Sequence, residues 1–99
     1  MFFPVKKYRI VGKSMEPTLK HGDSVLACHI AYKLSRPKKD HIVVVTHPTK
    51  GIPIIKRITK AKDSKFFLEG DNAKKSTDSN DFGWIERNRI LGKVFYTLS

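Results

Sequence analysis

Short runs of apolar, β-branched and aromatic residues recur along the chain, and Gly, Pro, Asp or Asn bounds each of them. Runs of this length and composition are typical of β-strands. No window of about 11 residues shows a 3.6-residue apolar period, so we expect little or no helix. The runs predict strands at 8–11, 24–29, 42–47, 52–59, 66–68 and 90–97. The pattern therefore favours an all-β domain.

Turn-forming residues separate these runs at 22–23, 37–40, 48–51 and 62–64. Gly, Pro, Asp and Asn favour turns because each permits or fixes a backbone conformation that strands avoid. The stretch 48–53 predicts a hairpin turn that joins two strands. The polar stretch 70–83 is too long for a plain turn, and its Asp, Asn and Ser side chains can bond to nearby backbone groups. We interpret it as a structured functional loop.

Ninety-nine residues are enough for one modest domain, so we expect residues 1–99 to form a single unit. The apolar share of 39% suits a globular chain with a thin core. The net charge of +11 favours anionic partners such as lipid head groups or nucleic acid, although a basic surface also serves solubility alone. The basic residues are scattered and form no nucleic-acid motif, so nucleic acid is an unfavoured partner.

The lone Cys28 excludes an internal disulfide and, with four scattered histidines, gives no zinc-like ligand spacing. We therefore expect no metal and no cofactor, and interpret Cys28 as a small buried apolar residue. The longest uninterrupted apolar run is 42–45, which is far shorter than the roughly 20 residues of a spanning helix. A cytoplasmic or membrane-associated location is consistent with this pattern.

Ser14 follows the first predicted strand, between Gly12 and the turn-fixing Pro17. Glycine permits close approach of another backbone, and a serine placed here can present its hydroxyl to a cleft. A serine that merely caps a turn would look the same. Because a serine hydroxyl is a poor nucleophile, catalysis would also require a base.

Lys56 is a candidate base because it lies in an Ile-rich strand. Burial disfavours the charged ammonium and can lower a lysine pKa from ~10.4 by several units, which makes the amine a competent base near neutral pH. A lysine that extends to solvent is the alternative interpretation, and the strand pattern alone leaves both open.

Four segments resemble, in the same order, the sequence boxes of the signal peptidase I family. Ser-Met-Glu-Pro-Thr-Leu at 14–19 resembles the nucleophile box, and Gly-Asp-Ser-Val-Leu at 22–26 is similar to the box that follows it. Lys-Arg-Ile at 56–58 resembles the lysine box, and 70–83 resembles the Gly-Asp-Asn box. The resemblance extends from about residue 8 to the end of the chain and implies a compact twisted sheet or partly open barrel.

The resemblance also implies a serine endopeptidase with a Ser–Lys dyad. Ser14 would be the nucleophile, Lys56 the general base, and Ser76 the residue that orients Lys56. Gly12 and Met15, on either side of the nucleophile, would support the dyad and the oxyanion site. A second set of residues would brace the loops of the site: Asp71, Asn72, Asp78, Ser79 and Arg57.

Two departures from the family pattern concern single residues. Gly12 stands where many relatives carry a serine that donates to the oxyanion, and Asn80 stands where an arginine often follows Asp-Ser. The change at Asn80 would remove an ion pair with Asp78.

The family's usual membrane anchor and large insertion domain are not recognised in this sequence, which we interpret as a bare catalytic core. Such a core is similar to the short proteases that mature nickel-type superoxide dismutases, and a signal peptidase separated from its anchor is an equal alternative. The expected partner is a protein or peptide with small residues before the cleavage site, with contact to an anionic membrane surface as a further expectation. Two alternatives stay open: a non-catalytic basic β-domain that binds nucleic acid or anionic membrane, and an autoproteolytic repressor-type core.

Overall fold

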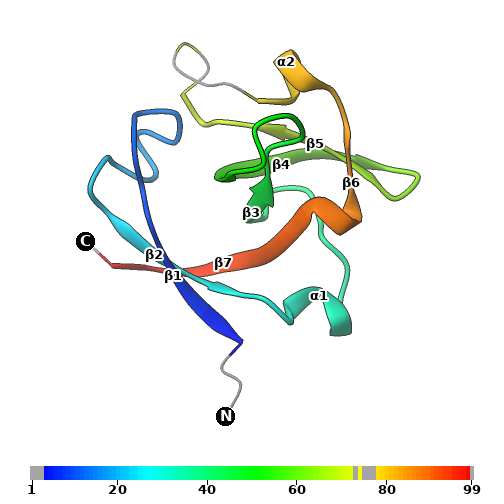
Figure 1. Ribbon diagram of the computed structural model, residues 1–99, viewed down its shortest axis with the longest axis horizontal. Helices are drawn as coiled ribbons and strands as arrows, with labels where there is room; N and C mark the ends of the chain where they lie inside the picture. Colours follow the sequence, from blue (N-terminus) through cyan, green and yellow to red (C-terminus); the bar gives the residue numbers. More distant parts are fainter. Residues whose placement is uncertain (1–3, 73, 75–77, 99) are drawn as a thin grey trace.

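The computed structural model of the protein describes residues 4–72, 74 and 78–98. Within these residues, seven strands form one antiparallel sheet in the order β1-β2-β7-β3-β4-β5-β6. The strands are β1 (Val5–Arg9), β2 (Ser24–Cys28), β3 (Ile42–Thr46), β4 (Pro53–Lys62), β5 (Lys65–Glu69), β6 (Ile85–Glu86) and β7 (Ile90–Leu98). Figure 1 shows that the sheet curls, with β1, β2 and β7 along one side and β4, β5 and β6 along another.

The prediction of an all-β fold with little helix is confirmed. In the described part of the chain, helical structure is limited to two four-residue helices, α1 (Ala31–Leu34) and α2 (Ser79–Phe82), and the 3₁₀ turn η2 (Arg87–Arg89). Every predicted strand overlaps an observed one, and β3 and β4 form the predicted hairpin. The strand β6 was not predicted, because two residues are too few to produce an alternating pattern.

Side-chain alternation along the curled sheet produces two buried apolar clusters. Inward-facing residues of β3, β4 and β5 form the larger cluster with α1 and β6: Tyr32, Val43, Val45, Ile58, Phe66, Leu68 and Ile85. The smaller cluster joins β2 to the segment after β1: Ile10, Met15, Leu19 and Val25. Because successive side chains of a strand point to opposite faces, Val43 and Val45 of β3 lie on the same face and enter the same cluster.

The segment that follows β1 is a loop whose two ends are tied together. The Ile10 N–H donates to the Asp23 carbonyl at 2.7 Å, and the Gly22 N–H donates to the Ile10 carbonyl at 2.9 Å. Met15 and Leu19 are almost fully buried and fix the loop against the sheet. The loop is therefore held at its base and by two apolar side chains, and Ser14 lies next to one of these anchors.

Gly92 on β7 packs directly against the backbone of β2. A Cβ atom at this position would lie 2.9 Å from the Cys28 carbonyl oxygen, which is closer than real Cβ contacts allow. Since β7 bonds to β2 on one side and to β3 on the other, it cannot move away without loss of ladder hydrogen bonds. The central strand thus requires glycine at this point.

We expect Gly92→Ala to destabilise the protein by about 1–3 kcal/mol, as overpacking of a well-packed site does. Chemical denaturation followed by circular dichroism measures this change, and Thr97→Ala, at an exposed position of the same strand, serves as the control. Equal stability of Gly92→Ala and the unsubstituted protein would show that β7 can shift without cost.

Candidate functional site

A cavity of about 430 Å³ lies between the end of β1, the loop that follows it, and the hairpin of β3 and β4. Three segments line it: residues 8–15, His47 with Lys50, and residues 52–56. Both Ser14 and Lys56 belong to this lining, although 42 positions separate them in the sequence. The fold thus brings the two predicted catalytic residues to the same cavity.

Ser14 is half-buried, in the loop that follows β1. Its neighbour Met15 has 1% of its surface exposed and anchors the turn. Within the part of the chain that the structure describes, the amide N–H groups of Ser14 and Met15 donate to no acceptor. Unengaged amides beside a hydroxyl are suited to hold a negatively charged oxygen.

Gly12 has a different reason to be glycine from the close approach that we expected. No atom lies within 4 Å of a Cβ built on it, whereas its φ of +88° belongs to the left-handed region. Its N–H donates to His21 Nδ1 at 2.9 Å and is therefore engaged. The backbone conformation, and no neighbouring backbone, requires glycine at this position.

Lys56 points into the sheet interior, and only 4% of its surface is exposed. The alternation of β4 places it on the same face as the fully buried Ile58. Burial lowers the pKa of Lys56 below its ordinary value, and the nearby carboxylates of Asp78 and Asp81 oppose this by raising it. The amine is thus held where the loss of its proton is favoured.

Asp71 joins three segments of the site. Its carboxylate accepts two hydrogen bonds from the Arg57 guanidinium, at 2.8 and 2.9 Å, and a third from the Thr18 hydroxyl. The Arg57 hydrogen bond, with that of Thr18, lowers the pKa of Asp71 despite its partial burial. Arg57 also donates to the Asp40 carbonyl at 2.9 Å. A paired fork of this kind fixes both partners in orientation as well as in distance.

Asn72 connects the same loop to the Ser14 segment. Its backbone N–H donates to the Ser14 carbonyl at 2.8 Å, and its Nδ2 donates to the Lys13 carbonyl at 3.1 Å. These bonds run between positions far apart in the sequence. They fix the backbone at Ser14 relative to the strand that carries Lys56, through Asp71 and Arg57.

Asp78 and Ser79 hold the start of α2 against β5. The Asp78 carboxylate accepts from the Gly70 N–H at 3.1 Å and forms a capping box with Asp81. The Leu68 N–H donates to Ser79 Oγ at 2.8 Å. Both side chains are buried, so the end of the polar loop is docked on the sheet.

Asn80, at the position where an arginine was expected, still contacts Asp78. Its Nδ2 donates to Asp78 Oδ1 at 3.0 Å and to Glu69 Oε2 at 3.0 Å. A hydrogen bond from a neutral amide to Asp78 is therefore present where an ion pair with arginine was considered. Ser76, predicted to orient Lys56, lies outside the described residues.

His47 also lines the site cavity, and no sequence pattern pointed to it. It directly follows β3, is 6% exposed, and packs edge-on against Phe82 of α2. Its Nδ1 accepts from the backbone amides of Thr49 and Lys50 at 3.2 and 3.1 Å. No motif surrounds this histidine, so only the turn of the hairpin places it in the cavity wall.

The described residues contain no group of three or more His, Cys, Asp or Glu side chains that could hold a metal ion. Cys28 is half-buried, in contrast to the fully buried position expected from the sequence. None of the described helices is long or apolar enough to cross a membrane.

Comparison with known proteins gives a consistent result. The family model described as "Signal peptidase, peptidase S26" matches residues 1–60. The probable signal peptidase I-2 of Synechocystis is 26% identical over a gapped alignment of 130 residues, which covers 87% of this chain and 59% of the relative. Signal peptidase IB of Staphylococcus aureus is 35% identical over 86 residues, which cover 87% of this chain and 44% of the relative.

The chain thus spans about half the length of these curated relatives. The matched residues 1–60 include the Ser14 loop, the hairpin of β3 and β4, and Lys56 with Arg57. The match covers more than half of the chain and includes all three segments that line the site cavity. The chain belongs to the signal peptidase family, peptidase S26.

Proposed function

We propose that the protein is a serine endopeptidase that removes an N-terminal leader or signal segment from a protein substrate, with Ser14 as nucleophile and Lys56 as general base. The observation that carries this proposal is the shared cavity, lined by a half-buried serine and a lysine that is 4% exposed. An exposed lysine would stay charged at neutral pH and could not accept a proton. Burial supplies what that role needs.

In the proposed reaction, Ser14 Oγ attacks the scissile carbonyl carbon as its proton passes to neutral Lys56 Nζ. Collapse of the tetrahedral intermediate breaks the carbon–nitrogen bond, and the leaving amine takes the proton from the Lys56 ammonium. Water then attacks the ester carbon and gives a proton to Lys56. The second collapse releases the carboxylic acid and returns a proton to Ser14 Oγ, so the enzyme ends unchanged.

The amide of Ser14 supports the oxyanion in this scheme. Its N–H is unengaged among the described residues, whereas that of Gly12 is bonded to His21. An aligned donor of this kind contributes about 2.7–4 kcal/mol to the transition state. The bonds from Asn72 to the backbone at Ser14 and Lys13 would keep this amide in place as charge develops.

The lining of the cavity is consistent with substrates that have small side chains before the cut. Ile10, Met15, Ile54 and Ile55 give it apolar walls close to Ser14 and Lys56. The buried side chains of Ile10 and Met15 limit the space beside the dyad. Small apolar side chains of a substrate would fit in that space and still contact these walls.

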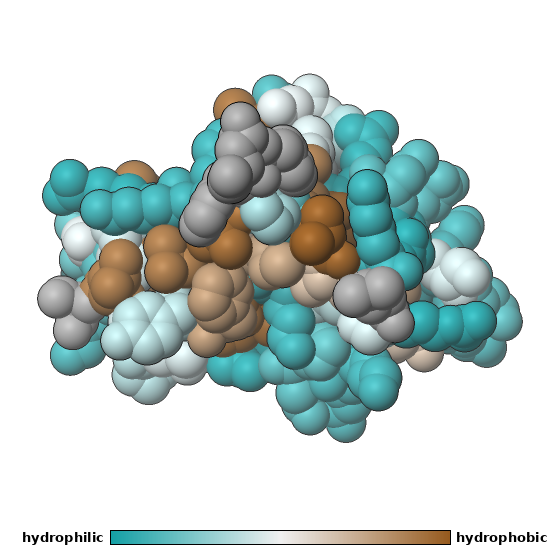
Figure 2. Space-filling view, turned by 90° about the horizontal axis from the view of Figure 1, so that it is seen from below, coloured by the Kyte–Doolittle hydropathy of each residue, from teal (hydrophilic) through white to brown (hydrophobic). Residues whose placement is uncertain are grey.

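The outer face of β1, β2 and β7 supports contact with an anionic membrane surface. Phe95, Tyr96 and Leu98 of β7 are 52%, 57% and 38% exposed. The exposed cations Lys7 and Arg9 lie on β1 at the same end of the sheet, two strands away. Figure 2 shows apolar side chains gathered across this lower face of the molecule. Apolar groups next to cations suit the boundary between acyl chains and anionic head groups.

We expect Ser14→Ala to lower cleavage of a leader peptide by more than about a thousand-fold, because the substitution removes the attacking hydroxyl. Lys56→Met retains the apolar stem and removes the base, so a loss of about 10²–10⁴-fold is expected. Peptide cleavage followed by mass spectrometry measures both. Lys60→Met, on the same strand and exposed, is the matched control and should retain activity. Full activity of folded Lys56→Met would exclude the dyad.

The lowered pKa of Lys56 predicts two pH dependences. The cleavage rate should rise with pH and level off below 10.5, the ordinary lysine value, because the neutral amine is the active form. Between its lowered pKa and 10.5 the unfolded state binds more protons than the folded state, so Lys56 makes stability rise with pH in that window. Thermal unfolding of Lys56→Met should lack this contribution. Identical pH profiles of stability for the two proteins would contradict a desolvated Lys56.

We expect Tyr96→Ser combined with Leu98→Ser to weaken sedimentation with phosphatidylglycerol vesicles by about ten-fold, through loss of buried apolar area. The control is Trp84→Ser, at an exposed position directly before β6, which is the strand at the other edge of the sheet. Equal loss in the control, or unchanged binding of the double variant, would refute membrane contact through β7.

A further inference from the structure

A second and larger cavity lies away from the proposed active site. Its volume is about 730 Å³, and it shares no lining residue with the cavity of Ser14 and Lys56. Its walls come from α1, the connection to β3, the hairpin turn between β4 and β5, and η2. This volume falls in the range of about 300–1,000 Å³ that is usual for pockets that hold small ligands.

The cavity has an apolar floor and a cationic rim. Tyr32 and Phe66 belong to the buried core and form part of the floor. One acidic side chain, that of Asp63, lies among the lining residues, against six cationic ones: Lys33, Arg36, Lys38, Lys39, Lys62 and Arg87. Among the described residues, none of these cations forms an ion pair. The excess of positive charge is therefore uncompensated by the protein.

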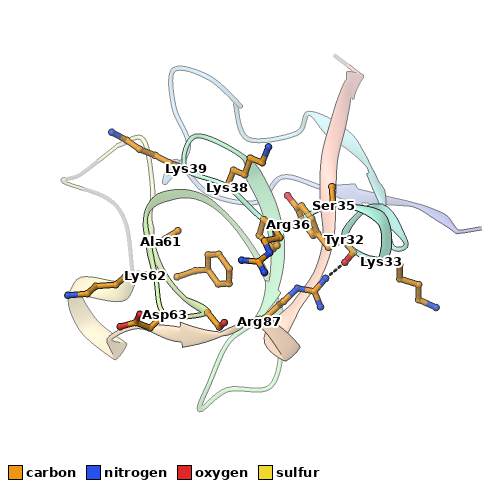
Figure 3. A pocket seen from close by; sticks show the side chains of 13 residues that line it. Tyr32, Lys33, Ser35, Arg36, Lys38, Lys39, Ala61, Lys62, Asp63 and Arg87 are labelled. Carbon is orange, nitrogen blue, oxygen red and sulfur yellow. Dashed lines mark hydrogen bonds between the residues drawn. The ribbon is translucent and has the colours of Figure 1, made fainter.

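Two of the six cations point into the cavity. Figure 3 shows the guanidinium group of Arg36 among the side chains at the middle and that of Arg87 extended across to the Tyr32 carbonyl, while Lys33, Lys39 and Lys62 project outward. Arg87 is held in this orientation by a hydrogen bond to the Tyr32 carbonyl. Like charges directed into one space repel each other, and an anion between them would convert the repulsion into attraction.

One residue behind the cavity is also affected by a cation of the rim. His41 bonds through Nδ1 to the Tyr32 hydroxyl at 2.8 Å. Burial, followed by the charges of Lys93 and Lys38, lowers the pKa of His41, and the charge of Asp40 opposes this. Of the two cations, Lys38 belongs to the lining of the cavity.

We propose that this cavity binds a phosphate group, either of a soluble phosphate ester or of a phospholipid head group. A guanidinium presents its N–H donors in a plane that matches two phosphate oxygens, and two such groups can hold one phosphate from two sides. A phosphate monoester carries about two negative charges, which suits six cations better than a single carboxylate does. The concave shape also fits one head group better than an extended nucleic acid strand.

The experiment is a titration of the protein with inorganic phosphate and with glycerol phosphate, followed by heteronuclear NMR. Saturable shifts are expected at residues 32–39, 61–66 and 87. Arg36→Gln with Arg87→Gln should raise the dissociation constant by about ten-fold or more, because charge-assisted bonds are lost. The control, Lys20→Gln with Lys60→Gln, removes the same charge from exposed positions outside the cavity.

A vesicle arm separates the two sources of phosphate. Sedimentation with phosphatidylglycerol vesicles that is weakened by the arginine substitutions identifies a lipid head group, whereas phosphate binding without such weakening identifies a soluble ester. Arg36 is exposed and makes no hydrogen bond among the described residues, so Arg36→Gln alone serves if the double variant does not fold.

Three results would overturn the proposal. The first is the absence of saturable shifts at the cavity. The second is equal weakening of phosphate binding by the arginine pair and the control pair, and the third is binding of oligonucleotides alone. Either of the last two would mean that the overall charge attracts polyanions without a site.

Discussion

The burial of one lysine amine is the constraint around which the site is organised. Lys56 occupies an inward position of β4, next to Ile58 in the alternation, and is almost entirely removed from water. A charged ammonium in this position costs free energy, which the carboxylates of Asp78 and Asp81 offset in part. Desolvation and these two carboxylates therefore act in opposite directions on the proton affinity of the amine.

A second requirement is that the nucleophile loop keeps its distance from that strand. Asp71 meets it by binding Arg57, the residue after Lys56, and Thr18 of the loop at once. Asn72, the next residue, bonds to the backbone at Ser14. Three segments that are remote in sequence are thereby connected through two adjacent side chains. The proposed chemistry depends on this connection as much as on the dyad itself, because misplacement of reacting groups by about 1 Å can cost a hundred-fold in rate.

The cationic residues of the protein lie in two different kinds of surroundings. Lys56 and Arg57 lie at the proposed active site, where burial lowers the pKa of Lys56 and the hydrogen bond with Asp71 raises the pKa of Arg57. The six cations that line the second cavity form no ion pair with a carboxylate among the described residues. The cations that make up the net charge of +11 therefore fall into at least two groups with different surroundings. Composition gives only the total charge and does not distinguish these groups.

The sequence by itself determined the strands and the principal hairpin, because β-branched runs and turn residues act locally. It also contained the four ordered boxes that resemble those of the family. It also named Ser14 and Lys56 as candidates. Only the tertiary structure placed both in one cavity, buried the amine, gave Asp71 its partners and put His47 in the wall. Desolvation and contacts between remote segments depend on how the sheet curls, and no local pattern in the chain records that curvature.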